Sequence, residues 1–322
     1  MKQLIINADD LGICRSTNRA IGEAFRHGVL TSASLMANGP AFDHAVESVI
    51  RPNPGLGIGL HICLTGGRSV SPPDDVPALV NEDGRFRHGF LSLLRLTLTK
   101  RASAIEQVER EVAAQFEKLR AHAVSIDHVD SHRHVHMIPA MFDVIVRLAR
   151  HYGCPAIRIS HEPLRAVQAL TRPSQLPLLA NNLPKKVVLS LLALRNRRRT
   201  PCLGSPSRVY GILGSGKMDL GRVVDAIQAA GSAASEIITH PGGCDPDLDG
   251  TLSRTDRQFL RSPNRGIEFE ALVNPHARAA LDRANVAPAR YQDLGAARDA
   301  VDDLRVAPRI TWKSARIGKL PR

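Results

Sequence analysis

The sequence has few of the residues on which disulfide-rich, nucleic-acid-binding and membrane-spanning proteins depend. Its five cysteines are scattered, include no CxxC pair and cannot all pair with one another. Aromatic residues make up only 4% of the chain, which leaves few platforms for base stacking. The longest apolar run, around Val187 to Leu194, is far shorter than the roughly 18 residues that cross a bilayer. These absences predict a cytoplasmic protein with no transmembrane helix.

The positive charge is concentrated in two segments. The net charge is +12, and eight basic residues against one acid lie between residues 162 and 205. Six basic residues against two acids follow residue 301, so these two segments supply 11 of the 12 charges. The rest of the chain is close to neutral, and a basic run alone is weak support for nucleic-acid binding. We expect no nucleic-acid partner.

Short apolar runs alternate with longer segments of helical period, which is typical of βα units around a parallel sheet or barrel. The first ten residues contain two acids and too short an apolar run for a secretory signal, so they are interpreted as a first strand. A chain of 322 residues suits one large domain with appendages. We expect seven strands, at residues 4–8, 30–36, 56–61, 124–130, 156–159, 209–213 and 236–239.

A basic segment interrupts this pattern at about residues 162–205. It contains five prolines, a predicted helix from Lys185 to Leu194, and the cluster Arg197 to Arg199. Most of that helix is apolar, so it either covers the active site, rests on a lipid surface, or packs on the domain with a solvated basic end. We interpret residues 1–294 as one domain with this basic amphipathic insertion, followed by a basic tail at 295–322.

The densest cluster of chemically active side chains lies near the fourth expected strand. Five such side chains recur at every second position: His128, Asp130, His132, His134 and His136. In an extended strand all five share one face. Buried imidazoles and carboxylates need partners or a metal, so the pattern favours chemistry over core packing. His128 is the member that a structural role explains most simply.

Other polar groups follow other expected strands. Asp9 and Asp10 end the first strand, His61 ends the third, and His240 follows the last. Catalytic groups in parallel α/β sheets and barrels lie at the carboxyl ends of the strands, so these residues and His132 are expected at one rim. A catalytic zinc-like site needs about three protein ligands, which a carboxylate and two imidazoles can supply.

Four blocks of sequence resemble a known family: NADDLG at 7–12, GLHICLT at 59–65, DSHRHVHM at 130–137 and HPG at 240–242. In order and spacing they resemble the YdjC-like carbohydrate deacetylases, which include chitooligosaccharide deacetylases and HpnK-like proteins of hopanoid gene clusters. The resemblance runs from residue 1 to about Leu294. It leaves out only the basic insertion and the tail.

The resemblance implies a divalent-metal deacetylase on a seven-stranded (β/α) barrel, a distorted TIM-like barrel of the glycoside hydrolase and deacetylase type. By this resemblance Asp10, His61 and His132 match the metal ligands and Asp9 matches the catalytic base. His240 is our choice for the acid that protonates the leaving amine. One magnesium or zinc ion is implied, since imidazole ligands favour zinc-like ions and the resemblance points to magnesium as well.

His134 and His136 have two interpretations that the sequence does not separate. They either orient ligands or substrate from a second layer around the metal, or they pack. The substrate is expected to be an acetylated carbohydrate, and the basic insertion makes a lipid-linked substrate at a membrane surface plausible. A peripheral membrane location and a homodimer are further hypotheses.

Two other functions compete with N-acetyl hydrolysis. Metal-dependent phosphoester hydrolases also use clusters of Asp and His, usually around two metals. A glycan- or lipid-binding protein without activity could keep the same fold.

Overall fold

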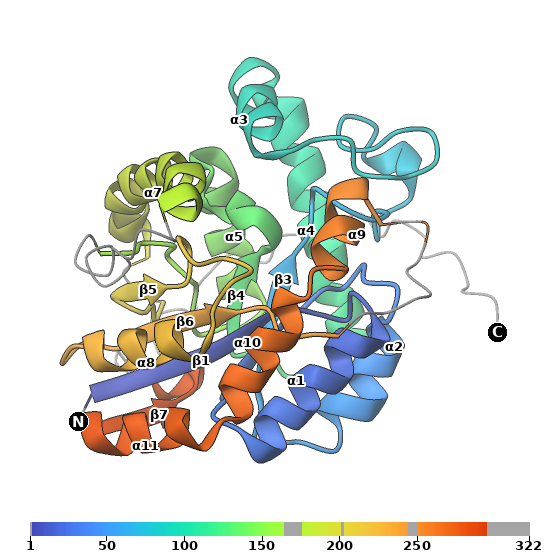
Figure 1. Cartoon of the computed structure of the whole chain (residues 1–322). Coiled ribbons are helices and arrows are strands. Elements are labelled where there is room, and N and C mark those ends of the chain that lie inside the picture. The colour runs from blue at the N-terminus through green and yellow to red at the C-terminus, as the bar shows by residue number, and fades with distance from the viewer. Residues whose placement is uncertain (1, 164–175, 201–202, 244–249, 251, 295–322) are drawn as a thin grey trace.

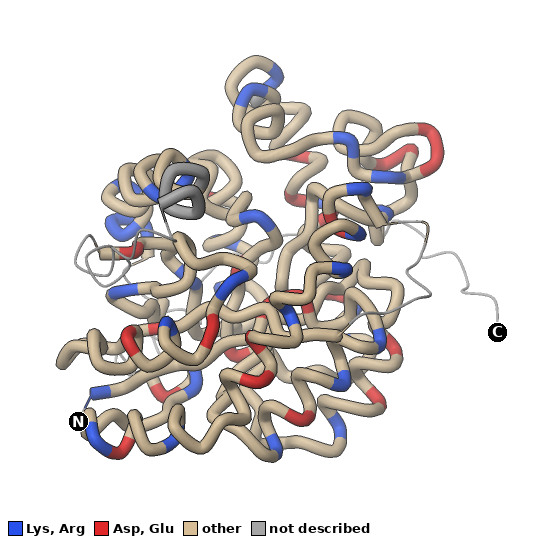
Figure 2. The backbone as a smooth tube through the Cα atoms, viewed as in Figure 1, with Lys and Arg blue, Asp and Glu red and all other residues tan. Residues whose placement is uncertain are grey.

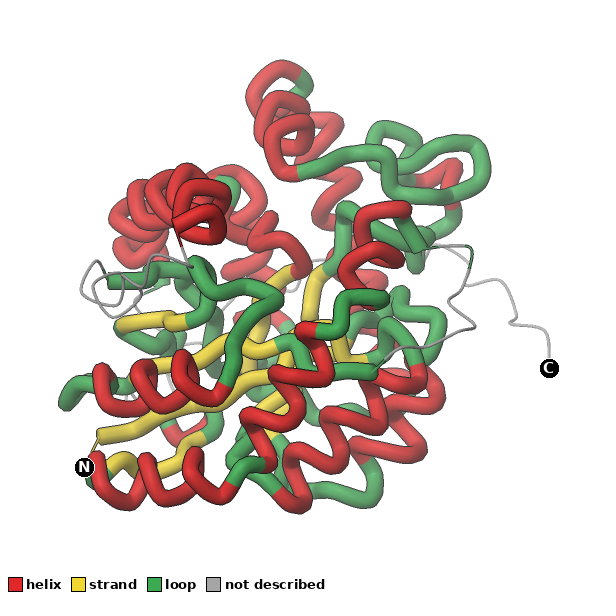
Figure 3. The backbone as a smooth tube through the Cα atoms, viewed as in Figure 1, coloured by secondary structure: helices red, strands yellow, loops and turns green. Residues whose placement is uncertain are grey.

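A computed structural model describes residues 2–163, 176–200, 203–243, 250 and 252–294, and shows an α/β fold around a curled parallel sheet (Figures 1 and 3). Strand β1 crosses its centre, and helices cover the sheet (Figure 3). Strand β1 is buried from Leu4 to Leu11, and its apolar run Leu4 to Ile6 packs on both faces of the sheet. The sequence-based prediction of an α/β fold with parallel strands is confirmed.

All strand pairs in the sheet are parallel. The strands follow the order β4 (His128–Ser131), β3 (Gly57–Ile62), β2 (Ser32–Leu35), β1 (Lys2–Leu11), β6 (Ser235–Thr239) and β5 (Arg208–Tyr210), and β7 (Val286–Ala289) pairs with β1.

Two details of the sheet differ from the sequence-based prediction. The segment at 156–159 is not a regular strand and forms only isolated bridges, of Ile157 with Val129 and of Ala156 with Gly204. Strand β7 was not predicted, because four residues that include Pro288 give little strand signal. It nevertheless pairs with the amino-terminal half of β1.

The helices lie around the sheet (Figure 3). The α-helices are α1 (Arg15–His27), α2 (Phe42–Ala45), α3 (Phe90–Thr99), α4 (Arg101–Ala121), α5 (Pro139–His151), α7 (Leu176–Asn196), α8 (Leu220–Ala229), α9 (Arg254–Leu260), α10 (Asn264–Val273) and α11 (Pro275–Ala284). Short helical turns are η1 (Val46–Ile50), η2 (Pro73–Asp75), η3 (His132–Met137), η5 (Arg197–Arg199) and η6 (Tyr291–Asp293). In the described residues no helix combines the length and the apolar character needed to cross a membrane.

Helices α4 and α5 show how the pattern positions the site. Val108, Val112 and Phe116 of α4 are fully or almost fully buried, at helical spacing. Burying such a side chain contributes about 1.5–3 kcal/mol. Helix α4 packs on α5 and on β3, and α5 follows η3 directly. These contacts fix the carboxyl ends of β3 and β4, where the histidines lie.

The histidine segment does not continue as a strand. Strand β4 ends at Ser131, and Arg133 and His134 have left-handed backbone conformations with φ of 57° and 56°. The expectation that all five alternate side chains share one strand face is therefore wrong beyond Asp130. The Ser131 side chain explains the turn, because its Oγ accepts a hydrogen bond from the His136 backbone N–H at 2.8 Å.

The basic insertion contributes a helix that is longer than predicted. Helix α7 spans Leu176–Asn196, contacts α5 and η3, and is tied to η3 by a 3.0 Å hydrogen bond from Asn196 Nδ2 to the Met137 carbonyl. Arg195 pairs with Asp143 of α5 at 2.8 Å. The parts of the insertion at 164–175 and 201–202, and the predicted basic tail at 295–322, lie outside the described residues.

We expect Gly59→Ala to destabilise the sheet. A Cβ at Gly59 would overlap the buried ring of His128, which stacks on Tyr291 with 3.9 Å between ring centroids. Overpacking of this kind costs about 1–3 kcal/mol. Urea unfolding measures the loss, with Gly89→Ala as the control because nothing lies within 4 Å of a Cβ there. Equal unfolding free energies for the two variants would contradict this packing.

Candidate functional site

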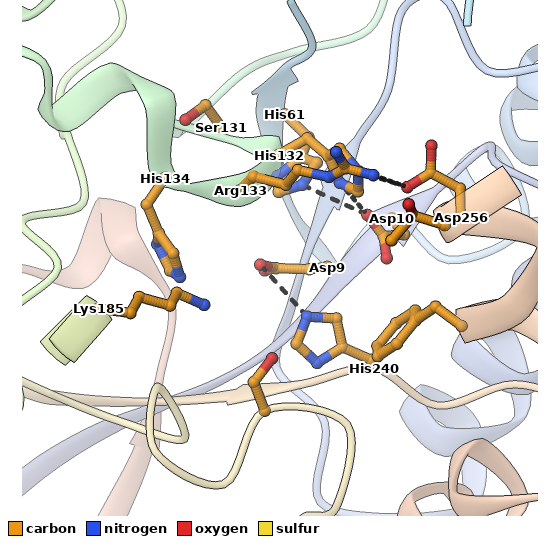
Figure 4. Close-up of a pocket in the computed structure, with 13 residues that line it drawn as sticks. Asp9, Asp10, His61, Ser131, His132, Arg133, His134, Lys185, His240 and Asp256 are labelled. Atoms are coloured by element: carbon orange, nitrogen blue, oxygen red, sulfur yellow. Dashed lines mark hydrogen bonds and ion pairs between the residues drawn. The ribbon is translucent and has the colours of Figure 1, made fainter. Parts of the chain in front are cut away.

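A cavity of about 160 Å³ lies at the carboxyl ends of the strands (Figure 4). Strand β1 supplies Asp9 and Asp10, β3 supplies His61, and η3 supplies His132. The remaining lining residues come from the ends of β4 and β6 and from surrounding helices and loops: Ser131, Arg133, His134, Lys185, Ser215, His240, Thr255, Asp256 and Phe259. The structure therefore brings together the side chains that the sequence placed at the ends of separate strands.

A backbone irregularity lets two adjacent carboxylates face the same cavity. Successive side chains in a strand normally point to opposite faces. Here the register of β1 against β2 shifts between Ala8 and Leu11, and Asp10 has a left-handed backbone with φ of 68°. Left-handed backbone at a residue other than glycine is uncommon and concentrates at functional sites. The sequence gives no signal for this irregularity.

Asp10, His61 and His132 converge on one point. One potential ligand atom from each lies within 4.8 Å of the others, and all three side chains are buried. Asp10 Oδ1 is 3.0 Å from His132 Nδ1 and 3.5 Å from His61 Nε2. A carboxylate and two imidazoles are a donor set that suits a zinc-like divalent cation.

Each of the two imidazoles has a second carboxylate on its other nitrogen. His61 Nδ1 is 2.8 Å from Asp130 Oδ1, and His132 Nε2 is 3.1 Å from Asp256 Oδ1. Metal-binding histidines commonly donate their other ring N–H to a carboxylate, which fixes the ring and its tautomer. The donor set and its surroundings thus fit a divalent cation.

The carboxylates also decide the titration of the two imidazoles. Burial alone would lower the pKa of His61, but Asp130 and Asp9 outweigh it and raise this pKa to about 10. Burial likewise opposes protonation of His132, and Asp10 beside it raises its pKa to about 10. The pKa of Asp10 is held well below its usual range despite burial, because of the two histidines. The site is thus an electrostatic environment that favours positive charge.

The buried guanidinium of Arg158 organises the neighbouring carboxylates. Its NH1 and NH2 donate to the two oxygens of Asp9 at 3.0 and 2.9 Å, and it pairs with Glu236 at 2.6 Å. It also forms an ion pair with Asp130. Asp9, His61 and Asp130 form a second set of possible ligands. Arg158 already supplies positive charge to both of its carboxylates, so the Asp10 set is the better candidate for holding a metal.

His240 lies across the cavity from the histidine turn (Figure 4). Its Nε2 is 3.9 Å from Asp9 Oδ2, and its backbone N–H donates to Glu268 at 2.5 Å. Burial lowers the pKa of the imidazole to about 4 although Asp9 and Asp10 oppose this. At neutral pH the ring is therefore uncharged.

The remaining histidines of the cluster occupy three different environments. His134 lines the cavity, and its Nδ1 lies 2.9 Å from Ser160 Oγ. Burial lowers its pKa well below the ordinary value. His136 is fully buried and does not line the cavity; its Nε2 lies 3.1 Å from the Arg158 carbonyl. His128 stacks on Tyr291 away from the cavity.

Sequence reasoning missed several charged residues of the site, among them Asp256, Arg158 and Lys185. Asp256 reaches His132 from α9, and Arg158 comes from the segment between β4 and β5. Lys185 of α7 points its ammonium into the cavity beside His134 (Figure 4). Burial lowers the pKa of Lys185 to about 8. Of these residues only Arg158 had a signal in the sequence, because a single arginine within the apolar run at 156–159 needs a buried partner.

Comparison with known proteins identifies the family. A family model described as YdjC-like protein matches residues 3–283. The chain belongs to the YdjC-like family. A chitooligosaccharide deacetylase from Salmonella typhimurium is 30% identical to it over 293 residues, which cover 90% of this chain and 98% of that protein. The resemblance inferred from the four sequence blocks is confirmed.

Other YdjC-like relatives match a shorter part of the chain. Carbohydrate deacetylases from Brevibacillus brevis and Geobacillus stearothermophilus are 42% and 40% identical over 48% and 54% of this chain. These matches span only 58% and 62% of those relatives' own lengths. The chain also resembles the crystal structure of a proposed cellobiose-phosphate cleavage protein from Enterococcus faecalis V583, with a TM-score of 0.70. The two sequences are 23% identical, and the match covers 91% of this chain and 99% of that chain. It supports the fold.

We expect Arg158→Met to destabilise this YdjC-like protein strongly. The substitution leaves Asp9, Asp130 and Glu236 buried without their shared cation, and breaking a buried pair costs about 3–5 kcal/mol. Arg147→Met is the control, because its pair with Glu109 is solvent-exposed on the arginine side and should contribute less than about 1 kcal/mol. Similar losses in urea unfolding would show that Arg158 does not hold the carboxylates together.

Proposed function

We propose that this chain is a metal-dependent hydrolase that removes an N-acetyl group from an amino sugar, an oligosaccharide or a glycoconjugate. The convergence of Asp10, His61 and His132 beside a separate carboxylate, Asp9, is the observation that carries the proposal. The deacetylase names of the YdjC-like relatives support the reaction class and the carbohydrate substrate. An acetate-release screen across N-acetylated saccharides and glycolipids, after metal reconstitution, tests it.

One divalent cation is proposed, with Asp10, His61 and His132 as its ligands. When bound, such a cation polarises an acetyl carbonyl and favours the deprotonated form of a water molecule. Two imidazoles favour zinc over magnesium by ligand preference. Asp130 and Asp256 would hold the two imidazoles in place through their other nitrogens.

The chain's own residues supply the proton transfers of amide hydrolysis. Asp9 is proposed as the base that takes a proton from the attacking water, with Arg158 fixing its orientation. The C–N bond then breaks, and the leaving amine needs a proton. His240 is proposed to carry it, because its Nε2 is 3.9 Å from Asp9 Oδ2 and its neutral ring can receive the proton before passing it on. His134 lines the same cavity and is proposed to contact substrate, whereas His136 supports the Arg158 backbone.

The competing functions make different demands on the site. A phosphoester hydrolase of the usual type needs two metals about 4 Å apart. Among the described residues the two possible ligand sets share His61, and Arg158 neutralises the second set. This favours one metal. A binding protein without activity would not require a base such as Asp9 beside the metal ligands.

The barrel architecture and the single domain at 1–294 are part of the proposal. Backbone hydrogen bonds from Arg158 to Val129 at 3.0 Å and from Val209 to His161 at 2.8 Å link the segment after residue 156 to both β4 and β5. This connection supports a distorted barrel of seven segments, in which the segment after residue 156 closes the gap between β4 and β5. The cytoplasmic location and the homodimer stay predictions from the sequence.

We expect Asp9→Asn to reduce turnover by about 10²–10⁴-fold, because the amide cannot accept the proton from water. Metal content should stay at that of the wild type, since Asp9 is not among the proposed ligands. Acetate release and elemental analysis measure the two effects on the same sample. Undiminished turnover would remove Asp9 from the mechanism, and phosphate release in place of acetate release would replace the proposed reaction.

We expect Asp256→Asn to weaken metal binding by about 10–100-fold, because it removes the carboxylate that orients His132. Competition with a coloured zinc chelator measures the affinity. Asp75→Asn is the control, since its carboxylate pairs with Arg110 on the surface. An affinity of Asp256→Asn equal to that of the control would exclude His132 as an oriented ligand.

A further inference from the structure

Two helices that contact η3 expose large apolar side chains. Leu91 and Leu98 of α3 are 76% and 72% exposed, and Leu191 and Leu194 of α7 are 62% and 66% exposed. Three further exposed residues, Leu183, Val187 and Val188, also belong to α7. Within the described chain, Ile267 is the one exposed large aliphatic residue outside these two helices. Such concentration differs from the scattered single residues of an ordinary surface.

The exposed residues form outward stripes at helical spacing. Residues 91, 95 and 98 lie on one face of α3, and residues 183, 187, 191 and 194 lie on one face of α7. The opposite face of each helix is already used, because Leu93 of α3 and Leu189 of α7 are buried in the core. The outer stripes are therefore surplus to the packing of this domain.

The charged residues within these two helices have one sign. Arg95 and Lys100 are exposed on and after α3, and Arg197 to Arg199 are exposed at the end of α7. Neither helix contains an acidic residue. Figure 2 shows basic residues along both helices. Exposed apolar stripes on helices whose own charged residues are all basic are typical of helices that lie on anionic lipid surfaces.

Both helices lie close to the proposed active site. Helices α3 and α7 each contact η3, the turn that carries His132 and His134. Lys185 of α7 lines the cavity itself. A surface that engages both outer stripes would therefore lie next to the cavity.

We propose that the outer stripes of α3 and α7 dock this protein onto an anionic lipid bilayer. Two other occupants match the surface less well. A second copy would place one basic face against another, and the segment after residue 301, with six basic residues and two acids, has the wrong charge. Anionic headgroups complement the arginines, and the acyl boundary takes up the leucines.

The inference rests on the proposed function in one respect. If the substrate is an acetylated sugar carried by a lipid, a docked chain meets it beside the cavity. The docking itself needs no turnover, so vesicle binding and acetate release are tested separately. A negative vesicle-binding result would overturn the docking and not the proposed reaction, and a negative acetate-release result would do the reverse.

Co-sedimentation with vesicles of phosphatidylcholine and phosphatidylglycerol tests the docking, using the full chain and the variant Leu91→Gln, Leu98→Gln, Leu191→Gln, Leu194→Gln. We expect the wild type to bind these vesicles, to bind phosphatidylcholine alone more weakly, and to lose binding as salt rises. The variant should bind about tenfold or more weakly. Ile267→Gln is the control, because it removes an exposed apolar residue on α10 and should bind as the wild type does.

Three results would overturn the proposal. The first is a wild type that sediments with neither vesicle, and the second is a fourfold variant that binds as well as the wild type. Alternatively, size-exclusion chromatography without lipid could show a dimer that the fourfold variant abolishes, which would assign the stripes to an interface between copies. Thermal unfolding of each variant confirms that the surface changes leave the fold intact, as expected for exposed positions.

Discussion

The arrangement of the site depends on one buried guanidinium group, that of Arg158. Arg158 is fully buried between Asp9, Asp130 and Glu236, three carboxylates that come from different strands. Without it these charges would repel one another in a medium of low dielectric constant. With it, Asp9 is held in place and Asp130 is fixed beside His61. Arg158 therefore determines both the position of the proposed base, Asp9, and the orientation of one proposed ligand, His61.

A second constraint is the backbone of Asp10. Its left-handed conformation, within a shift of strand register, turns two consecutive carboxylates toward one cavity. Asp9 then contacts the guanidinium, while Asp10 contacts two imidazoles. Adjacent residues thus acquire different environments, which is what separate roles as base and ligand require.

Much of this arrangement could be predicted from the sequence, because the carboxyl ends of parallel strands meet at one edge. That rule located Asp9, Asp10, His61 and His240. It could not locate Asp256, whose spacing from Ser253 indicates only a helix cap, a contact that does exist at 3.1 Å. The period-two pattern at 128–136 was misleading, since left-handed residues other than glycine leave no sequence signal. Arg158 acquires its partners only through long-range folding.

The central claim is that Asp10, His61 and His132 hold one divalent cation next to Asp9. Anomalous diffraction from crystals soaked with zinc tests this most directly, because it locates each bound ion independently of activity. A single strong peak in contact with these three side chains is expected. A peak between Asp9 and Asp130, two peaks in the cavity, or zinc bound only elsewhere would contradict it.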